Sequence, residues 1–325
     1  MTDLSVIIPI YNTPIPMLQR CFASVAALTG ITWEALLIDD GSQAETGTFC
    51  KDFCQDNPNF RYVYQENGGV SAARNKGLSL ACGQFLTFLD ADDALLTEAI
   101  TSDLLAENRE LVLFDILLDD QGAESVWSAF EAPAGAVTQQ QLLCRLVASK
   151  SLNGPVAKLY KRSVIDEHAL RFNEGFITGE DWNFVCDYAL CVQDITYRKD
   201  TVYRYFRDGA TSLGRLARQP DVMLSNHLDM YARKLTLADL TDDPTALKNI
   251  AARDLVETLF NIAADLLLLK ALTDQRKATI QATVAKLSLA AASRKTRIKA
   301  AVICKHFYCL RPLALLRRLY LKRKH

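Results

Sequence analysis

The sequence predicts an α/β fold, with a mostly parallel sheet flanked by helices, followed by a smaller α-helical C-terminal region. In the first half of the chain, apolar segments rich in β-branched residues alternate with segments whose apolar residues recur at helical spacing. Two of the apolar segments end in adjacent acidic residues. Strands that alternate with helices form parallel sheets, and ligands bind beyond the carboxyl ends of such strands. We therefore expect a site at this edge of the sheet.

The individual elements follow from the apolar pattern taken in order. Short β-branched runs bounded by turn residues are typical of strands, and a period of 3.6 residues is typical of helices. The pattern predicts strands within 4–12 and 35–42 and at 60–64, 85–89 and 111–118, with helices at 17–28, 49–53 and 71–82. From residue 216 to residue 292 it predicts helices, one of which starts at Asp243-Pro244.

A run of three carboxylates follows the strand expected at 85–89: Asp90, Asp92 and Asp93. Side chains alternate along an extended backbone, so the first two point to the same side, which suits a hard divalent cation with open positions for phosphate oxygens. The alternative is an acidic helix N-terminus capped by Asp93. A second acidic pair, Asp39-Asp40, ends another strand, and we expect both pairs to face one crevice.

Five motifs occur in order along residues 3 to about 215. They are Val-Ile-Ile-Pro-Ile-Tyr-Asn, Ile-Asp-Asp-Gly-Ser, Glu-Asn-Gly-Gly-Val-Ser-Ala-Ala-Arg-Asn-Lys-Gly-Leu, Phe-Leu-Asp-Ala-Asp-Asp and Gly-Glu-Asp-Trp. In type, order and spacing they resemble the inverting family 2 glycosyltransferases. The resemblance implies a GT-A fold, in which a Rossmann-like sheet binds a nucleotide-sugar, and it covers roughly two thirds of the chain.

The resemblance also implies a nucleotide pocket. It assigns hydrogen bonding to a pyrimidine base to Asp40, with Asp39 beside it, and closure over the diphosphate to Arg207, with Arg204 as the alternative. Contacts to the nucleoside would come from Pro9, Tyr11, Asn67, Gly68, Arg74 and Asp90. The residues alone leave other roles open. Asp39-Asp40 could form a turn, Tyr11 could be a core tyrosine, and Arg74 could form an ion pair with Asp40 or Asp90.

Chemistry is expected from two further acidic sites. The resemblance implies that Asp92, with Asp90, binds Mn²⁺ or Mg²⁺, which neutralises charge on the leaving diphosphate. It also implies that Asp181 is the general base, with Glu180 orienting the acceptor or the base. Adjacent carboxylates raise one another's pKa, which favours this role. The alternative is that Asp181 caps the helix that follows.

The expected activity is therefore inverting, metal-dependent transfer from a nucleotide-sugar, most simply a UDP-sugar, to a glycan or lipid-linked glycan hydroxyl. The bacterial enzymes that the chain resembles build lipopolysaccharide, capsule or exopolysaccharide. Two other classes stay open. A nucleotidyltransferase would need the same nucleotide pocket and acids, and a non-catalytic glycan-binding protein could retain a transferase scaffold.

Charge is distributed unevenly along the 325 residues, whose net charge is −1. Residues 275–325 hold 14 Lys and Arg and no acidic residue, so they carry +14, whereas residues 1–274 carry −15. We therefore expect a transferase domain at 1–215 and a helical region at 216–325 whose basic amphipathic tail, about 294–325, binds an anionic membrane surface. Packing of the tail on the acidic domain, or helix dimerisation, is the alternative. No nucleic-acid-binding motif accompanies the charge, so nucleic acid is not an expected partner.

The nine cysteines form no Cys-x-x-Cys pair, and we expect buried thiols in a reducing compartment. The first predicted strand begins within a few residues of Met1, without a signal-peptide pattern. These features favour a cytoplasmic protein, peripheral on the inner face of the cytoplasmic membrane.

Overall fold

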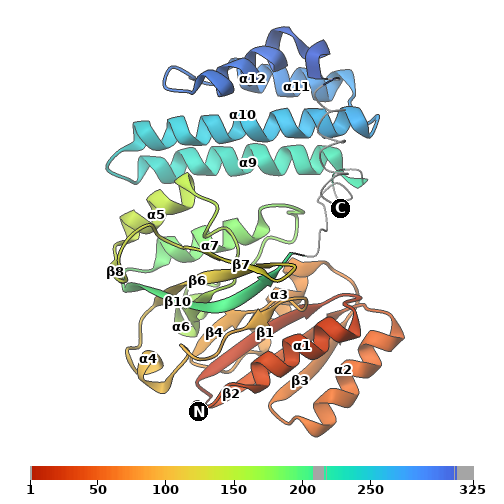
Figure 1. Cartoon of the computed structure of the whole chain (residues 1–325), viewed down its shortest axis with the longest axis vertical. Helices are drawn as coiled ribbons and strands as arrows, with labels where there is room; N and C mark the ends of the chain where they lie inside the picture. The colour runs from red at the N-terminus through yellow and green to blue at the C-terminus, as the bar shows by residue number, and fades with distance from the viewer. Residues whose placement is uncertain (1, 208–215, 217, 311, 313–325) are drawn as a thin grey trace. The chain divides into compact units, whose positions relative to one another are not determined.

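A computed structural model describes residues 2–207, 216, 218–310 and 312, and Figure 1 shows its elements in order. The chain divides into two compact units. The first unit contains Met1–Gly175 and Glu180–Asp208, and the second contains Phe176–Gly179 and Gly209–His325. The boundary predicted between residues 215 and 216 falls next to residues 208–215, which are outside the described part.

The first unit is built on one ten-stranded sheet with the order β3-β2-β1-β4-β9-β6-β10-β5, to which β7 and β8 add beside β6 and β10. Four parallel strands form one side: β1 (Leu4–Ile10), β2 (Trp33–Asp40), β3 (Phe60–Gln65) and β4 (Phe85–Phe88). The other strands are β5 (Ala94–Leu95), β6 (Leu111–Asp120), β7 (Ala123–Trp127), β8 (Gly135–Val137), β9 (Lys158–Lys161) and β10 (Ile195–Phe206). The predicted α/β fold with parallel N-terminal strands is confirmed.

The second half of this sheet is mixed. β9 lies between β4 and β6 and is antiparallel to both, whereas β10 is parallel to β6. The alternation of strands and helices in the sequence predicts parallel strands, so it did not predict that β9 is inserted antiparallel between β4 and β6.

Helices cover the sheet (Figure 1). They are α1 (Ile15–Ala26), α2 (Ala44–Asp56), α3 (Val70–Leu80), α4 (Ser102–Ala106), α5 (Gln139–Ala148), α6 (Arg162–Glu167) and α7 (Glu180–Cys191). α1 buries Leu18, Cys21, Phe22 and Val25, which repeat at helical spacing on one face. α5 starts with a capping box in which Thr138 and Gln141 satisfy each other's backbone N–H groups.

The second unit is helical, as predicted. Its helices are α9 (Pro220–Asp239), α10 (Pro244–Leu268), α11 (Asp274–Ala285) and α12 (Arg294–Lys305), with a short 3₁₀ turn at Phe307–Cys309. The predicted start at Asp243-Pro244 is confirmed, because the Asp243 side chain accepts from Ala246 N–H. Leu255, Leu259, Ile280 and Ile303 are among the residues of its core.

The segment Phe176–Gly179 packs within this second unit. Ile177 N–H donates to the Asn226 Oδ1 atom of α9 at 3.0 Å, and Asn226 is buried. Gly179 has a φ of +82°, and a Cβ atom there would lie 2.2 Å from Met230 Sδ, so any other residue would strain the backbone and displace the Met230 side chain. The segment leads directly into α7 of the first unit.

Three cysteines, Cys21, Cys50 and Cys186, are buried as predicted, but Cys82 is exposed and five others are half-buried. All nine are free thiols. Among the described residues, no helix is both long enough and apolar enough to cross a membrane.

Close packing of α3 against β1 yields a stability prediction. Gly77 is buried on α3, and a Cβ atom there would lie 2.4 Å from Ile7 Cγ2. Alanine is favoured over glycine in a helix by about 1 kcal/mol, but overpacking a core costs about 1–3 kcal/mol. We therefore expect Gly77→Ala to lower the free energy of unfolding in urea. The exposed neighbour provides the control, since Lys76→Ala should change it by less than about 0.5 kcal/mol. Equal or greater stability of Gly77→Ala would contradict this packing.

Candidate active site

Acidic side chains gather where the parallel strands end. Asp39 and Asp40 are the last residues of β2, and Asp90 and Asp92 follow β4. β1 lies between these two strands in the sheet, so both pairs lie at one edge of it. The sequence predicted this arrangement.

Asp40 is buried and organises the loop after β3. Its Oδ1 accepts from Gln65 Nε2 and Gly68 N–H, and its Oδ2 accepts from Gly69 N–H, each at 2.8 Å. Asn67 Nδ2 donates to the Asp40 backbone carbonyl, also at 2.8 Å. A carboxylate offers about four acceptor positions, so three protein donors leave roughly one for a base N–H.

The turn after Asp40 lies very close to this loop. Gly41 has a φ of +79°, and a Cβ atom there would lie 2.8 Å from Asn67 N. Glycine is therefore required both by the left-handed backbone and by the close approach. Asp39 accepts from Ser42 N–H at 2.8 Å and from Tyr62 Oη at 2.6 Å. The turn role that the residues left open for Asp39 is thus present.

Two residues at the carboxyl end of β1 differ in exposure. Pro9 is half-buried in β1, whereas the Tyr11 side chain is 57% exposed. The core-tyrosine alternative for Tyr11 is therefore wrong, and its ring is available to stack on a base. Asn12 ties this end of β1 to the turn after β2, because its Oδ1 accepts from Gln43 N–H at 2.8 Å and its N–H donates to Ser42 Oγ at 3.0 Å.

Arg74 joins the acids after β4 to those of α7. Its Nη2 lies 2.8 Å from Asp90 Oδ1 and its Nη1 lies 2.6 Å from Asp181 Oδ1, with the guanidinium 5.3 Å from the centre of the Phe172 ring. The side chain is only 3% exposed. Burial opposes its charge, but the carboxylates of Asp181 and Asp90 outweigh burial and raise the pKa of Arg74. Of the two partners open in the sequence, Asp90 is confirmed, whereas the Asp40 carboxylate accepts from Gln65, Gly68 and Gly69.

Glu180 and Asp181 form the first turn of α7. Glu180 is buried, and its Oε2 has no hydrogen-bond partner among the described residues. Asp181 keeps 31% of its side-chain surface exposed while it pairs with Arg74. A helix N-terminus favours negative charge, and so does the buried guanidinium, so the site stabilises Asp181 as a carboxylate.

Asp93 has a role that the sequence analysis did not predict. It is buried, accepts from Phe206 N–H at 2.9 Å and Tyr203 Oη, and is followed by the strand β5. The alternative that Asp93 caps a helix is therefore wrong, because the strand β5 follows it. Burial raises the pKa of Asp93 to about 8, against the hydrogen bonds that lower it. Its partners lie more than a hundred residues away in sequence, so no local pattern shows them.

Two carboxylates at this edge of the sheet could hold a divalent cation together with phosphates. Asp92 is exposed, and Asp90 uses Oδ1 for Arg74, which leaves Oδ2. Among the described residues, no group of three or more His, Cys, Asp or Glu side chains could hold a metal alone. Mg²⁺-type ions are usually bound through one or two carboxylates together with substrate phosphates, and these two carboxylates fit that pattern.

The two arginines predicted near the diphosphate differ in their partners. Arg204 is bound to Asp119 and Glu124, so it is held on the sheet. Arg207 is exposed, and its Nη1 reaches Asp120 Oδ2 only at 4.0 Å. Arg207 is thus the freer of the two, as the sequence analysis preferred. The segment 208–212 of the same predicted closing region lies outside the described residues.

Lys158 is a residue of this region to which the sequence analysis assigned no role. It is 2% exposed on β9, and its Nζ donates to the carbonyls of Gly154 at 2.6 Å and Val156 at 3.1 Å. Burial lowers the pKa of Lys158 to about 7, and the carboxylate of Asp181 opposes the shift. The signal present in the sequence is the mixture of basic and aromatic residues in the segment 154–162.

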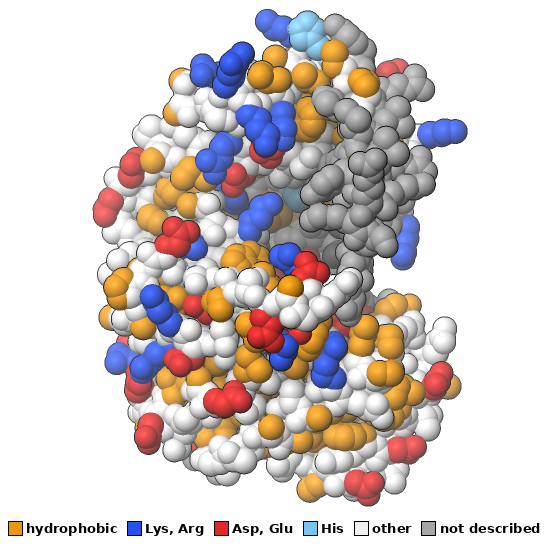
Figure 2. Space-filling view, viewed as in Figure 1, with side chains coloured by type: hydrophobic (Ala, Val, Ile, Leu, Met, Phe, Trp, Pro, Cys, Tyr) orange, Lys and Arg blue, Asp and Glu red, His pale blue; other side chains and the backbone are white. Residues whose placement is uncertain are grey.

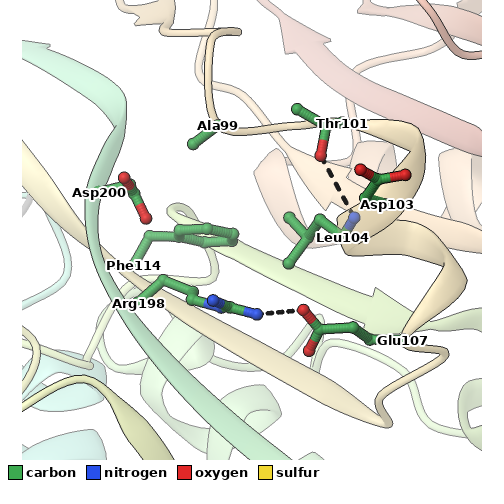
Figure 3. Close-up of a pocket in the computed structure, with 8 residues that line it drawn as sticks. All are labelled: Ala99, Thr101, Asp103, Leu104, Glu107, Phe114, Arg198 and Asp200. Atoms are coloured by element: carbon green, nitrogen blue, oxygen red, sulfur yellow. Dashed lines mark hydrogen bonds and ion pairs between the residues drawn. The ribbon is translucent and has the colours of Figure 1, made fainter.

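A separate pocket of about 230 Å³ lies away from these residues in the first unit. Figure 3 shows Arg198 paired with Glu107 along its floor, with Phe114 and Leu104 beside them. None of the predicted site residues lines it.

Comparison with known proteins identifies the family. The model of glycosyl transferase family 2 matches residues 5–167, and the chain belongs to this family. Glycosyltransferase GlyA of Streptococcus pneumoniae is 28% identical over 226 residues, 64% of this chain and 31% of GlyA. A Campylobacter jejuni protein described as GalNAc(5)-diNAcBac-PP-undecaprenol beta-1,3-glucosyltransferase is 27% identical over 66% of this chain and 68% of its own length.

The fold is shared with a solved structure. S. aureus TarS 1–349 in complex with UDP-GlcNAc superposes with a TM-score of 0.61 at 20% identity, covering 94% of this chain and 92% of that one. The match to GlyA spans about a third of the length of that protein.

The Arg74 bridge yields an activity prediction. A lysine offers a single point charge and cannot pair with both carboxylates in the geometry of a guanidinium. Losing one charge-assisted hydrogen bond costs about 1.5–3 kcal/mol, so we expect Arg74→Lys to lower kcat/KM for glycosyl transfer by about 10- to 100-fold. Arg61→Lys, on the exposed side of β3, is the matched control and should retain full activity. Wild-type kcat/KM in Arg74→Lys would show that the double pairing is dispensable.

Lys158 yields a prediction about pH. Its pKa is about 7 in the fold and 10.5 ordinarily, so between these values the unfolded chain binds more protons and stability rises with pH. The wild-type free energy of unfolding, minus that of Lys158→Met, should therefore increase from pH 7 to pH 9 by about 1–3 kcal/mol. Urea unfolding at pH 7, 8 and 9 measures this difference. For the control Lys76→Ala, the difference in free energy of unfolding from wild type should not change with pH. If the difference for Lys158→Met does not change either, the pKa of Lys158 is not lowered by burial.

Proposed function

We propose that this protein is an inverting glycosyltransferase that moves a sugar from a nucleotide-sugar, in the simplest case a UDP-sugar, to a hydroxyl of a glycan or lipid-linked glycan. The observation that carries the proposal is the double pairing of Arg74, at 2.8 Å to Asp90 and 2.6 Å to Asp181. One buried guanidinium thereby links the donor side of the site to its candidate base.

The donor side is supported by the groups at the ends of β1 and β2. Asp40 has roughly one acceptor position left for a pyrimidine N–H, and its loop is fixed by Gly68 and Gly69 N–H groups. Tyr11 offers an exposed ring to the base. Asp90 Oδ2 is available for a ribose hydroxyl or for an ion, and Arg207 is the candidate cation for the diphosphate.

Metal dependence is part of the proposal. Asp92 and Asp90 would hold Mn²⁺ or Mg²⁺ together with the donor phosphates. When bound, the ion would neutralise the negative charge that develops on the diphosphate as its bond to the sugar breaks.

Asp181 is the candidate general base. Its partly exposed carboxylate takes the proton of the acceptor hydroxyl, and the acceptor oxygen then bonds to the anomeric carbon from the face opposite the diphosphate, which leaves with the electrons of the broken bond. Arg74 and the α7 N-terminus keep Asp181 ionised for this step. Glu180, with an unpaired buried Oε2, is the candidate to orient the acceptor.

Relatives support a role in bacterial surface polysaccharide synthesis. The Campylobacter protein is described as acting on an undecaprenol-linked glycan, and TarS was crystallised with UDP-GlcNAc. Both descriptions agree with a nucleotide-sugar donor and a lipid-linked or polymeric acceptor for this chain.

Contact with the inner face of a cytoplasmic membrane is a further part of the proposal. One face of α12 exposes Arg294, Arg297, Ile298 and Lys305, and Ile298 is 54% exposed among these bases. Figure 2 shows Lys and Arg side chains gathered over the helical unit on the face drawn. A basic helix face with an apolar centre suits an anionic lipid surface, and such a surface would hold the enzyme beside a lipid-linked acceptor.

A nucleotide panel tests the donor class. A ligand that binds the native state raises the free energy of unfolding, by about 2.7 kcal/mol at a ligand concentration of 100 times Kd. The melting temperature rises with it. We expect UDP with Mn²⁺ to raise the Tm more than GDP, CMP or dTDP, and we expect Asp92→Asn to lose the Mn²⁺-dependent part. Asp181→Asn should keep the UDP shift but lose transfer by at least about 100-fold. No shift with any nucleotide would refute the proposal, and full glycosyl transfer by Asp181→Asn would refute the assignment of Asp181 as the general base.

Vesicle flotation tests the membrane surface. Each basic residue near an anionic surface contributes about 1 kcal/mol, so Arg297→Glu with Lys305→Glu should lower binding to phosphatidylglycerol vesicles by at least about 10-fold. The matched control reverses two exposed charges of the first unit, Arg61→Glu with Lys76→Glu, and should float like wild type. Equal flotation of the α12 variant, or wild-type binding that resists 0.5 M salt, would reject α12 as the binding face.

A further inference from the structure

The proposed reaction does not use Lys158, although it is the most deeply buried lysine near the site. It is 2% exposed and forms no ion pair with any described carboxylate. Its Nζ donates instead to two backbone carbonyls, of Gly154 at 2.6 Å and Val156 at 3.1 Å. Burying an ammonium group without a paired acid is costly, so its presence calls for a function.

The two bonds of Lys158 belong to a set that holds one turn, residues 154–157. Tyr160, two residues further along β9, is fully buried and its Oη donates to the Pro155 carbonyl at 3.0 Å. Three successive carbonyls are thus held by two side chains of the strand that follows them. Ala157 adopts a φ of +54°, a left-handed conformation that disfavours alanine, and its carbonyl accepts from Phe114 N–H at 3.1 Å. The turn is therefore fixed against its backbone preference.

Sheet topology places this turn at the edge that carries the site. β9 is antiparallel to β4 and to β6, so the residues that enter β9 lie at the edge where β4 and β6 have their carboxyl ends. β4 leads at that edge into Asp90 and Asp92. The turn thus stands beside the donor acids, where ligands of parallel strands bind.

The charge of Lys158 is coupled to the candidate base. The carboxylate of Asp181 opposes the lowering of the Lys158 pKa that burial causes, which requires the two groups to interact. Arg74 on α3 also pairs with Asp181, and Glu180 precedes it in the first turn of α7, so Lys158 acts on Asp181 beside at least these two charged groups.

We propose that Lys158 is a positioning residue for glycosyl transfer, which fixes the turn 154–157 as a wall for the transferred sugar or the acceptor and supports Asp181 electrostatically. The inference rests on the proposed function and adds to it a residue that touches neither substrate nor metal. Gly154 is the half-buried residue of this turn, and sugar hydroxyls are the ligand class that would contact it.

Three variants separate the two effects of Lys158. Lys158→Met keeps the apolar stem and removes both the charge and the hydrogen bonds. Lys158→Gln keeps N–H donors without the charge. Tyr160→Phe is the matched control, because it removes one hydrogen bond to the same turn and leaves the charge in place.

Steady-state kinetics with a UDP-sugar and varied acceptor is the main measurement. We expect Lys158→Met to lower kcat/KM for the acceptor at least 10-fold and to leave the UDP-induced shift in Tm unchanged. The acid limb of its pH profile should move to higher pH by about half a unit or more, because Asp181 loses a nearby positive charge. Lys158→Gln should show the same displacement, and Tyr160→Phe should show none. A merely structural role would lower the rate without moving the limb.

Amide hydrogen exchange supplies a readout that needs no activity. Peptides covering residues 150–157 should exchange faster in Lys158→Met than in wild type, while peptides from β1 and β2 should not change. Unchanged exchange in this turn, or an unmoved acid limb in an active Lys158→Met enzyme, would overturn the inference. If the wild type binds no nucleotide, the proposed function fails, and the exchange experiment still decides whether Lys158 fixes the turn. If Lys158→Met does not fold, the same two readouts on Lys158→Gln decide the question.

Discussion

The pairing of one buried guanidinium with two carboxylates is the interaction on which the site depends. Arg74 is 3% exposed and lies between Asp90 and Asp181, at 2.8 and 2.6 Å. Two carboxylates that approach the same buried guanidinium would repel each other without it, and the cation between them offsets that repulsion. Moving any one of these three groups away would leave the others without their charge partner, which is costly. The positions of α3, the loop after β4 and the start of α7 therefore depend on one another.

The proposed nucleotide side of the site is organised by hydrogen bonds within the protein. Backbone N–H groups of Gly68 and Gly69 bind Asp40, and Asn67 binds the carbonyl of the same residue. Because these hydrogen bonds already order the loop, binding of a nucleotide there would require little further ordering of the protein. The same donors explain why the acid is buried without a cationic partner, because bonds from backbone amides stabilise a carboxylate.

Much of the fold and part of the site could be predicted because their signals are local. The apolar periods define β1 to β4 and their helices, and acids at strand ends define the edge where Asp40 and Asp90 lie. The rest depends on pairing between distant residues. Arg74 and Asp181 are 107 residues apart, and Asp93 and Tyr203 are 110 apart, so neither contact leaves a local pattern. The four-residue strand β9 was missed for a related reason, since its basic and aromatic residues carry no strand period.

The assignment of Phe176–Gly179 to the helical unit has a consequence for how this chain can be divided and recombined. Ile177 is bound to Asn226, and Gly179 leaves no room for a side chain beside Met230, yet the next residue is Glu180. A single cut after residue 208 therefore does not separate two independent modules, because four residues of the second remain inside the first. In evolution, replacement of the helical unit by another would also have required matching changes immediately before the candidate base, so the two parts of the sequence are expected to have diverged together.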